Sequence, residues 1–328
     1  MAAVVLAYEQ AANYRQLNPD LTSVPSAISL DAAMTPTHYG LADSSHAYSH
    51  HGSSSTILGR IDRTGAIETL TVPASRRSTI DGNYLWSPST DSGGTLYRVD
   101  LSTFSGYDTW SIDAGTDSSY STITDGIAVD DNGDLWICTR QAAPSPVRPK
   151  LTKFDTSAET FGPSYTIVAS VGITDLTVAI SGTYAYLTQR DGNNDAFIYK
   201  VDLSDGSLSA SLDSGLQNPA DLIIIGTNGY LLGTDGSGVV KLVKFVLSTL
   251  TIDTTLTVAA DGSYSRLTTD GTSIWTAGGN ISADQVHKVN ASTMTLDVSL
   301  TIGVSLTARL ATYFDALTRG WVVGSVGW

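Results

Sequence analysis

The sequence predicts an all-β fold, a seven-bladed β-propeller of four-stranded antiparallel blades. Three observations lead to this prediction. Short apolar segments alternate with turns rich in Gly, Asn, Asp and Ser, and helical periodicity is almost absent. Two short motifs recur along most of the chain, which is typical of repeat architectures. The chain also opens with two short strand patterns and closes with an incomplete copy of the repeat, so its two ends complement one another.

The first motif is a basic residue, an apolar residue and usually Asp or Asn. Successive copies lie 38 to 55 residues apart, which is the repeat length of four-stranded propeller blades. The copies begin at Arg60, Arg98, Lys153, Lys200, Lys244 and Lys288, and the Lys244 copy ends in Val246 instead of an acid or amide.

The second motif is a short strand that precedes most copies of the first and ends in a large side chain. Seven copies in 328 residues correspond to about 47 residues per blade. The copies are "THYGL" at Thr37–Leu41, "YLW" ending at Trp86, "DLW" at Trp136, "YAY" at Tyr186, "YLL" at Leu232, "SIW" at Trp275 and "GWVV" at Trp321–Val323.

Each repeat is interpreted as strands A to D, running from the axis outwards. Strand A, such as Gly126–Asp130, lines the central channel, and a tight turn at Asp131–Gly133 leads to strand B. The large strand B residue is expected to pack between neighbouring blades. The Asp or Asn that ends strand C can accept hydrogen bonds from the backbone of the C–D turn. The bases before it alternate with apolar residues and are expected to point away from the core.

The closing blade is expected to combine both ends of the chain. Residues 307–328 supply strands A and B, near Thr307–Tyr313 and Trp321–Val326, and residues 1–22 supply strands C and D at Val4–Glu9 and Asn13–Leu17. Residues 23–306 form six full blades of the same domain. Closing the ring removes sheet edges that would otherwise invite aggregation.

Composition excludes several classes of partner. The net charge of −14 argues against nucleic acid, which requires a basic surface. No segment approaches the length of a membrane span, and "MAAVVLAY" lacks the basic start of a signal peptide. Cys138 is the single cysteine, so the fold is expected to rest on packing without disulfides.

The segment "DGIAVDDNGDLWICTR" at Asp125–Arg140 resembles a blade of the NHL-repeat, SMP-30 and streptogramin-lyase group of propellers. The likeness is sharp over this one blade and implies the propeller fold. It also implies, as an alternative function, a lyase or lactonase that depends on a divalent metal. The histidine base of the streptogramin lyases has no counterpart, because His287, the one His outside the N-terminal segment, falls in a strand C.

The longer B–C loops form the first candidate surface, since binding residues concentrate on loops over a rigid scaffold. These loops are Asp43–Ser55, Arg140–Lys150 and Arg190–Ala196. Tyr suits contact with protein or glycan. The candidate contact residues on this face are Tyr48, His50, His51, Tyr120, Arg140, Arg148, Arg190, Asp191 and Tyr264.

Two groups of side chains are candidate metal ligands. His46, His50 and His51, with Asp43, could bind a transition metal, although a solvated polar loop explains the same residues. Asp125, Asp175 and Asp221 start strand A in three consecutive blades, and could hold Mg²⁺ or Ca²⁺ at the channel mouth. Ion pairs along the rim with Arg77, Arg266 and Arg309 are the alternative, and no cofactor is expected to be required.

Three functions remain open. The favoured one is a non-enzymatic structural or interaction propeller, such as a phage tail or capsid-associated protein that docks on other structural proteins of the particle and on a host-surface protein or glycan. The low share of charged residues, 15%, and the polar uncharged surface support it. The alternatives are the metal-dependent lyase or lactonase and a glycan- or protein-binding recognition module. We expect a virion or extracellular location, or alternatively the cytoplasm, and no membrane insertion.

Overall fold

The computed structural model describes residues 4–9, 13–17, 28–29, 36–43, 45–51, 56–62, 64, 66–75, 77–89, 94–112, 120–141, 148–167, 177–191, 193–260, 263–280, 283–303 and 309–313. Every regular element in these ranges is a β-strand. None of the described residues forms a helix with the length and apolar character that a membrane crossing needs.

The described strands assemble into seven four-stranded sheets. Six sheets use strands consecutive in the chain. They comprise β4 (Pro36–Ala42), β5 (His46–His51), β6 (Ile57–Asp62) and β7 (Ile67–Thr71); β8 (Thr79–Asp81), β9 (Tyr84–Pro88), β10 (Thr95–Asp100) and β11 (Asp108–Ser111); β12 (Tyr120–Val129), β13 (Leu135–Gln141), β14 (Arg148–Asp155) and β15 (Thr160–Thr166). They continue with β16 (Thr177–Ser181), β17 (Tyr184–Arg190), β18 (Ala196–Asp202) and β19 (Leu208–Leu216); β20 (Asn218–Ile225), β21 (Asn228–Thr234), β22 (Val240–Val246) and β23 (Thr251–Ala259); β24 (Ser263–Thr269), β25 (Ser273–Asn280), β26 (Ala283–Asn290) and β27 (Thr295–Gly303).

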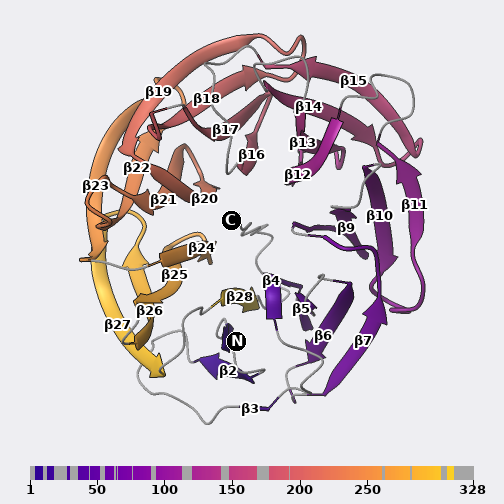
Figure 1. Ribbon diagram of the computed structural model, residues 1–328, viewed down its shortest axis with the longest axis horizontal. Helices are drawn as coiled ribbons and strands as arrows, with labels where there is room; N and C mark the ends of the chain where they lie inside the picture. Colours follow the sequence, from indigo (N-terminus) through magenta and orange to yellow (C-terminus); the bar gives the residue numbers. More distant parts are fainter. Residues whose placement is uncertain are drawn as a thin grey trace.

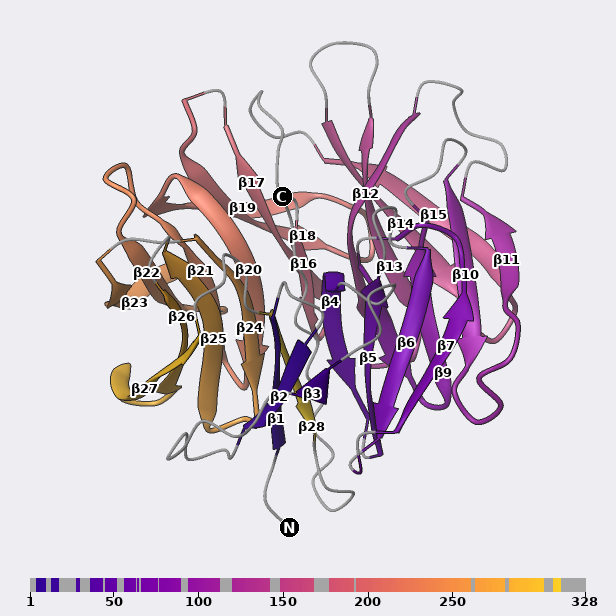
Figure 2. The ribbon, with the colours of Figure 1, turned by 60° about the horizontal axis from the view of Figure 1, so that its bottom comes forward.

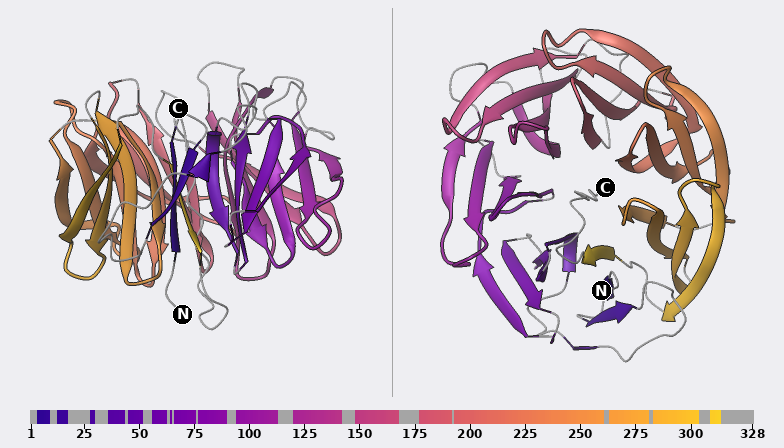
Figure 3. Two further views of the ribbon diagram at one scale, coloured as in Figure 1. Left: turned by 90° about the horizontal axis from the view of Figure 1, so that it is seen from below. Right: turned by 180° about the vertical axis from the view of Figure 1, so that it is seen from behind.

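These sheets stand as blades around a central axis. In Figure 1, strands β12, β16, β20 and β24 face the centre, and β15, β19, β23 and β27 lie on the circumference. Figure 3 shows the same ring from the side and from behind. All strand pairs inside the blades are antiparallel neighbours in sequence order. The prediction of an all-β propeller with four-stranded antiparallel blades is therefore confirmed.

The remaining sheet joins the two ends of the chain, with strands in the order β28 (Arg309–Tyr313), β1 (Val4–Glu9), β2 (Asn13–Leu17) and β3 (Ile28–Ser29) (Figure 2). Strand β1 pairs directly with β28, so that Leu6 lies opposite Ala311. The prediction that Val4–Glu9 and Asn13–Leu17 are strands C and D is therefore wrong, because they occupy the second and third positions. The predicted strand at Trp321–Val326 lies outside the described residues.

In every contiguous blade an aromatic residue of strand B lies directly opposite the base of strand C. The pairs are Tyr48 with Arg60, Trp86 with Arg98, Trp136 with Lys153, Tyr186 with Lys200, Tyr230 with Lys244, and Trp275 with Lys288. Two copies of the second motif were therefore misplaced. Thr37–Leu41 lies in the innermost strand β4, and Tyr230 rather than Leu232 holds the aromatic position.

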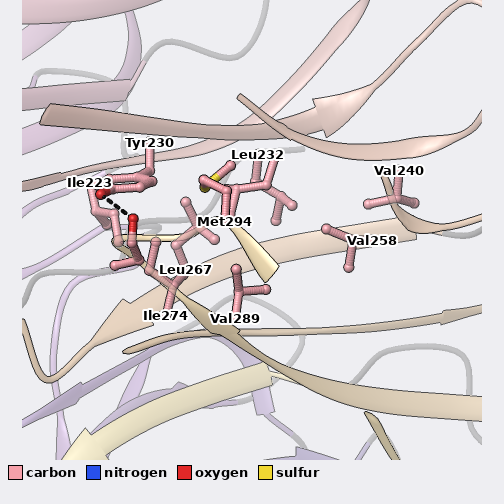
Figure 4. Packing of buried hydrophobic residues seen from close by; sticks show 11 residues of the cluster. Ile223, Tyr230, Leu232, Val240, Val258, Leu267, Ile274, Val289 and Met294 are labelled. Carbon is pink, nitrogen blue, oxygen red and sulfur yellow. Dashed lines mark hydrogen bonds between the residues drawn. The ribbon is translucent and has the colours of Figure 1, made fainter. Parts of the chain in front are cut away.

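The strand B aromatics pack between blades, as expected. Trp86 and Trp275 are at most 1% exposed, and Trp86 packs in one apolar cluster with Ile127 and Phe154 of the next blade. Figure 4 shows one cluster, in which Tyr230 and Leu232 from one blade meet Leu267, Ile274 and Met294 from the next. Burial of these side chains, at about 25 cal/mol per Å² of apolar surface, is what holds neighbouring blades together.

Four bases of strand C, at Arg60, Arg98, Lys200 and Lys244, link their blade to the next instead of pointing away from it. Arg60 lies over the ring of Phe104, 4.5 Å from its centroid, and donates a hydrogen bond of 2.7 Å to the carbonyl oxygen of Leu101 in the next blade. Lys200 makes the same kind of bond, 3.0 Å long, to the carbonyl of Leu247. Cation–π contact and a charge-assisted hydrogen bond together explain why a base recurs here.

The C–D turns follow one plan. The Asp or Asn that ends strand C accepts hydrogen bonds from backbone N–H groups two residues later, as Asp202 does from Ser204 at 2.8 Å. Four residues after that position the backbone turns left-handed, at Phe104, Glu159, Gly206, Leu250 and Met294. Leu250 and Met294 bury their side chains at 5% exposure. The predicted capping role of the Asp or Asn is confirmed, and burial offsets the left-handed strain at Leu250 and Met294.

Candidate functional site

A cavity of about 340 Å³ lies on the axis, lined by the innermost strands β8, β12, β16, β20 and β24. Most of its wall is aliphatic. The lining residues are Thr79, Ile80, Asp81, Ile127, Ala128, Val129, Asp130, Asp131, Gly133, Val178, Ala179, Ile180, Leu222, Ile223, Ile224 and Thr269. Asp131 and Gly133 belong to the turn between β12 and β13. The cavity therefore reaches the face of the A–B turns, opposite the face of the B–C loops that the sequence favoured.

Strand β8 contributes two polar residues to this wall, Thr79 and Asp81, separated by Ile80. Alternation along a strand places Thr79 and Asp81 on the same face. Within the described residues, no hydrogen bond or ion pair involves the Asp81 carboxylate, and burial raises its pKa. The Thr79 hydroxyl is fully buried and has no hydrogen-bond partner in the described chain.

Asp130 lines the same cavity, but its oxygens are occupied. Oδ1 accepts hydrogen bonds from the backbone N–H groups of Asn132 (2.8 Å) and Asp134 (3.1 Å), and Oδ2 accepts one from the indole of Trp136 (2.9 Å). Asp130 thus shapes the A–B turn and orients the strand B aromatic. Asp130 is therefore a second carboxylate in the cavity wall, but both of its oxygens already accept hydrogen bonds, unlike those of Asp81.

The predicted histidine loop is largely a strand. His46, Tyr48 and His50 lie in β5, and the side chains of Tyr48 and His50 are 1% exposed. His50 Nε2 is 2.9 Å from Ser78 Oγ in the next blade. His46 and His50 are four strand residues apart, about 13 Å. His46 and His50 therefore do not converge, and the side chain of His51 lies outside the described part.

Asp43, the fourth ligand considered, is the cap of the turn before β5. It accepts hydrogen bonds from the backbone of Ser45 and His46 and from the hydroxyl of Tyr48. These bonds lower the pKa of Asp43 despite its partial burial, which acts in the opposite direction. Its role in the described structure is therefore that of a turn cap, like the acids that end strand C.

The predicted ring of aspartates is described only in part. Asp221 is fully buried and joins two blades, since Oδ1 accepts from the N–H of Leu222 (3.0 Å) and Oδ2 from the N–H of Leu267 (2.9 Å). Asp125 lies in β12 with its side chain outside the description, and Asp175 lies outside it altogether. Over the described residues, no three His, Cys, Asp or Glu side chains are grouped to hold a metal ion.

The remaining residues predicted for the B–C face divide into two sets. Arg190 donates a hydrogen bond of 2.6 Å to Asn218 in the next blade, and Asp191 caps the tight turn between β17 and β18. For the others, only the strand position is described. Tyr120 lies in β12, Arg140 in β13, Arg148 in β14 and Tyr264 in β24. Tyr48, proposed as a contact residue, is wrong for that role because it is buried.

Asp81 is not among the predicted site residues, because the predicted acids were those at the start of strand A and Asp81 lies at its end. Asp81 and Asp130 both follow an apolar strand A and precede a tight A–B turn, in "TIDGNY" and "AVDDNG". Comparing the ends of the inner strands would have placed both residues at one mouth of the channel.

No protein-family model and no curated protein matches this sequence. Solved structures match in fold. AztD from Citrobacter koseri superposes with a TM-score of 0.65 at 8% identity, over 99% of each chain. A putative 6-phosphogluconolactonase from Bacteroides uniformis gives 0.64 at 12% identity, over 94% of this chain and 100% of that one. BamB from Moraxella catarrhalis gives 0.54 at 15% identity, over 92% and 86%. At these identities the likeness shows the β-propeller fold alone, and the chain is a β-propeller of the kind these proteins share.

Proposed function

We propose that this protein is a non-enzymatic interaction propeller that docks a partner protein on the face of the A–B turns. The observation that carries the proposal is the axial cavity of about 340 Å³, which combines an aliphatic wall with the unpartnered carboxylate of Asp81. Cavities of this size with a few convergent polar groups are the usual form of binding sites. The net charge of −14 favours approach of a basic partner.

A setting in a phage tail or capsid, with docking on other particle proteins and on a host-surface protein or glycan, is part of the proposal. Its support is compositional: charged residues make up 15% of the chain, so uncharged polar residues cover much of the surface. A virion or extracellular location follows from the same argument, with the cytoplasm as the alternative.

The test compares two asparagines that occupy equivalent turns on opposite faces. Asn132 and Asn193 are both exposed, and the N–H of each donates to the Oδ1 of an Asp two residues earlier. Immobilised wild type, Asn132→Lys and Asn193→Lys are exposed to a host extract or to particles, and retained proteins are identified by mass spectrometry. We expect a retained partner that is lost with Asn132→Lys and kept with Asn193→Lys. Loss with Asn193→Lys alone would overturn the choice of face.

The metal-dependent lyase or lactonase is the second candidate, favoured by the fold shared with the putative 6-phosphogluconolactonase. The control assay measures hydrolysis of aliphatic and sugar lactones with Mg²⁺, with Ca²⁺ and with EDTA. Turnover that requires the metal, together with a stoichiometric ion by mass spectrometry, would replace the interaction proposal. A glycan-binding role would instead show as retention on a glycan array that Asn132→Lys abolishes.

A further inference from the structure

Two buried or half-buried polar groups in the axial cavity lack partners. Polar groups that leave water are normally hydrogen-bonded, and an unpaired one calls for an explanation. Thr79 and Asp81 stand two residues apart on β8 and line the cavity together. An ionised carboxylate only accepts hydrogen bonds, and a hydroxyl accepts as well as donates. Together they form a site for a group that carries several donors.

The wall around this pair is aliphatic and lacks aromatic rings. Ala179 and Ile180 come from β16, and Leu222, Ile223 and Ile224 come from β20. No Lys, Arg or His is among the lining residues, so nothing in the described wall neutralises Asp81. Such a wall suits a hydrocarbon stem, each buried methylene of which contributes about 0.8 kcal/mol.

The charge of the cavity favours a cation. Asp130 and Asp131 also line it, next to the end of β12 and in its turn, and the oxygens of Asp130 bind the turn and Trp136. Lys153 of β14 is paired with Asp134 of this turn at 2.5 Å. A cation that enters therefore finds three carboxylates, and the carboxylate of Asp81, beside the Thr79 hydroxyl, accepts no hydrogen bond within the described residues.

We propose that the cavity binds an alkylammonium group, with the ammonium donating to Asp81 and Thr79 and its aliphatic stem against Ile180, Leu222 and Ile224. This inference deepens the proposed function by naming the chemistry that the docking face recognises. A compact ammonium with three rotatable donors suits two separate acceptors, whereas a guanidinium favours bidentate carboxylates and aromatic faces. The group could come from a Lys side chain of a partner protein or from a free aliphatic amine.

The test is isothermal titration calorimetry of the full chain with hexylamine, hexanol and hexylguanidine at pH 7.5. The matched variants are Asp81→Asn and Asp253→Asn, which removes a surface carboxylate paired with Lys244. We expect hexylamine to bind at least tenfold more tightly than hexanol or hexylguanidine. Asp81→Asn should weaken hexylamine at least tenfold, and Asp253→Asn should leave it unchanged. Equal binding by Asp81→Asn and wild type, or tighter binding of hexylguanidine, would overturn the inference.

A second set of titrations distinguishes a partner Lys side chain from a free amine, and tests the amine site separately from partner docking. The peptide Gly-Gly-Lys-Gly-Gly binding more tightly than hexylamine supports a partner side chain, and the reverse supports a free amine. Hexylamine binding that depends on Asp81, without any partner retained on the A–B face, would keep this inference and remove the docking proposal. A partner that is retained equally by the wild type and by Asp81→Asn would keep the docking proposal and remove this inference.

Discussion

The hydroxyl of Tyr230 donates a hydrogen bond of 2.8 Å to the carbonyl oxygen of Ala291, 61 residues along the chain and in the next blade; the dashed line in Figure 4 marks it. Tyr186 makes the equivalent bond to Leu247 at 3.1 Å, also 61 residues away. Both tyrosines are buried, and burial raises the pKa of each hydroxyl. One side chain thus joins the strand B of one blade to the C–D turn of the next.

The two carbonyl groups differ in the hydrogen bonds that they keep when the tyrosine hydroxyl is removed. Tyr186→Phe leaves the Leu247 carbonyl still bonded to Lys200 at 3.0 Å, whereas no other described side chain is seen to donate to the Ala291 carbonyl. We expect Tyr230→Phe to lower the free energy of unfolding by about 1–2 kcal/mol and Tyr186→Phe by less than about 1 kcal/mol. Urea denaturation followed by tryptophan fluorescence measures both. Equal losses would show that Lys200 does not compensate.

The left-handed residue of the C–D turn offers a second prediction. Leu250 has a φ of 49° and is 5% exposed. Leu250→Ala should cost about 2–4 kcal/mol of stability because a buried side chain is truncated while the strain remains. Leu250→Gly should recover about 1 kcal/mol of that loss, since glycine adopts a positive φ without strain. Thermal melting compares the two variants. Glycine more damaging than alanine would contradict the strain argument.

The equivalent turn in the preceding blade provides the control. Gly206 has a φ of 74°, and a Cβ placed there would collide with the ring of Tyr165. Gly206→Ala should therefore lower the stability, because alanine is strained at this φ and its Cβ collides with Tyr165. Removing the glycine destabilises this turn, whereas introducing one at Leu250 relieves strain.

Asp221 is expected to act as a structural clamp. Asp221→Asn turns an amide NH₂ toward an N–H donor, of either Leu222 or Leu267, inside the protein. We expect a loss of about 2–4 kcal/mol, against less than about 0.5 kcal/mol for Asp253→Asn at the surface. Chemical denaturation with and without EDTA measures both variants. If EDTA lowers the stability of the wild type but not that of Asp221→Asn, Asp221 is instead a metal ligand.

Acid sensitivity is expected to depend on His287. Burial lowers its pKa from 6.5 to about 4, and the side chain is 3% exposed. The unfolded chain takes up a proton near pH 6.5 and the folded chain only near pH 4, so stability falls as the pH drops between these values. The loss is up to about 3 kcal/mol. His287→Gln, which can still bond Ser299, should flatten the pH dependence of unfolding between pH 7 and pH 4. An unchanged slope would assign the acid sensitivity to other groups.

Ring closure can be tested by a cross-link. Leu6 and Ala311 are opposite one another in the β1–β28 pair, where Cα atoms lie about 4.5–5.5 Å apart, within disulfide range. Leu6→Cys/Ala311→Cys should form an intramolecular disulfide, seen as faster migration on a non-reducing gel. Cys138 is fully buried and does not compete. The pair Leu6→Cys/Asp253→Cys should remain reduced. A free thiol count of three in the first variant would refute the pairing.

Repeat spacing predicted the blade type because each blade buries the same aromatic and caps the same turn. It placed the closing strands one position too far out, since Val4–Glu9 was assigned to strand C and Asn13–Leu17 to strand D. The structure puts Ala7 opposite Arg15, and Arg15 lies 45 residues before Arg60, so Arg15 occupies the base position of that blade. Loop length also misled: Tyr48 and His50 resemble polar loop residues because Ser and His surround them, although the four consecutive β5 residues from Ala47 to His50 are all buried. The axial cavity depends on which strand ends meet across the ring, and no local pattern contains that information.

The pairing of β1 with β28 sets the order in which the ring can be completed during synthesis. Tyr8 and its partner Arg309 are separated by about 300 residues, which a ribosome adds in roughly 15–60 s at 5–20 residues per second. Throughout that interval the edge of β1 that faces the axis lacks its partner strand β28. The nascent chain must therefore carry an open sheet edge until β28 has been translated, which makes β1 the natural place for a chaperone to act.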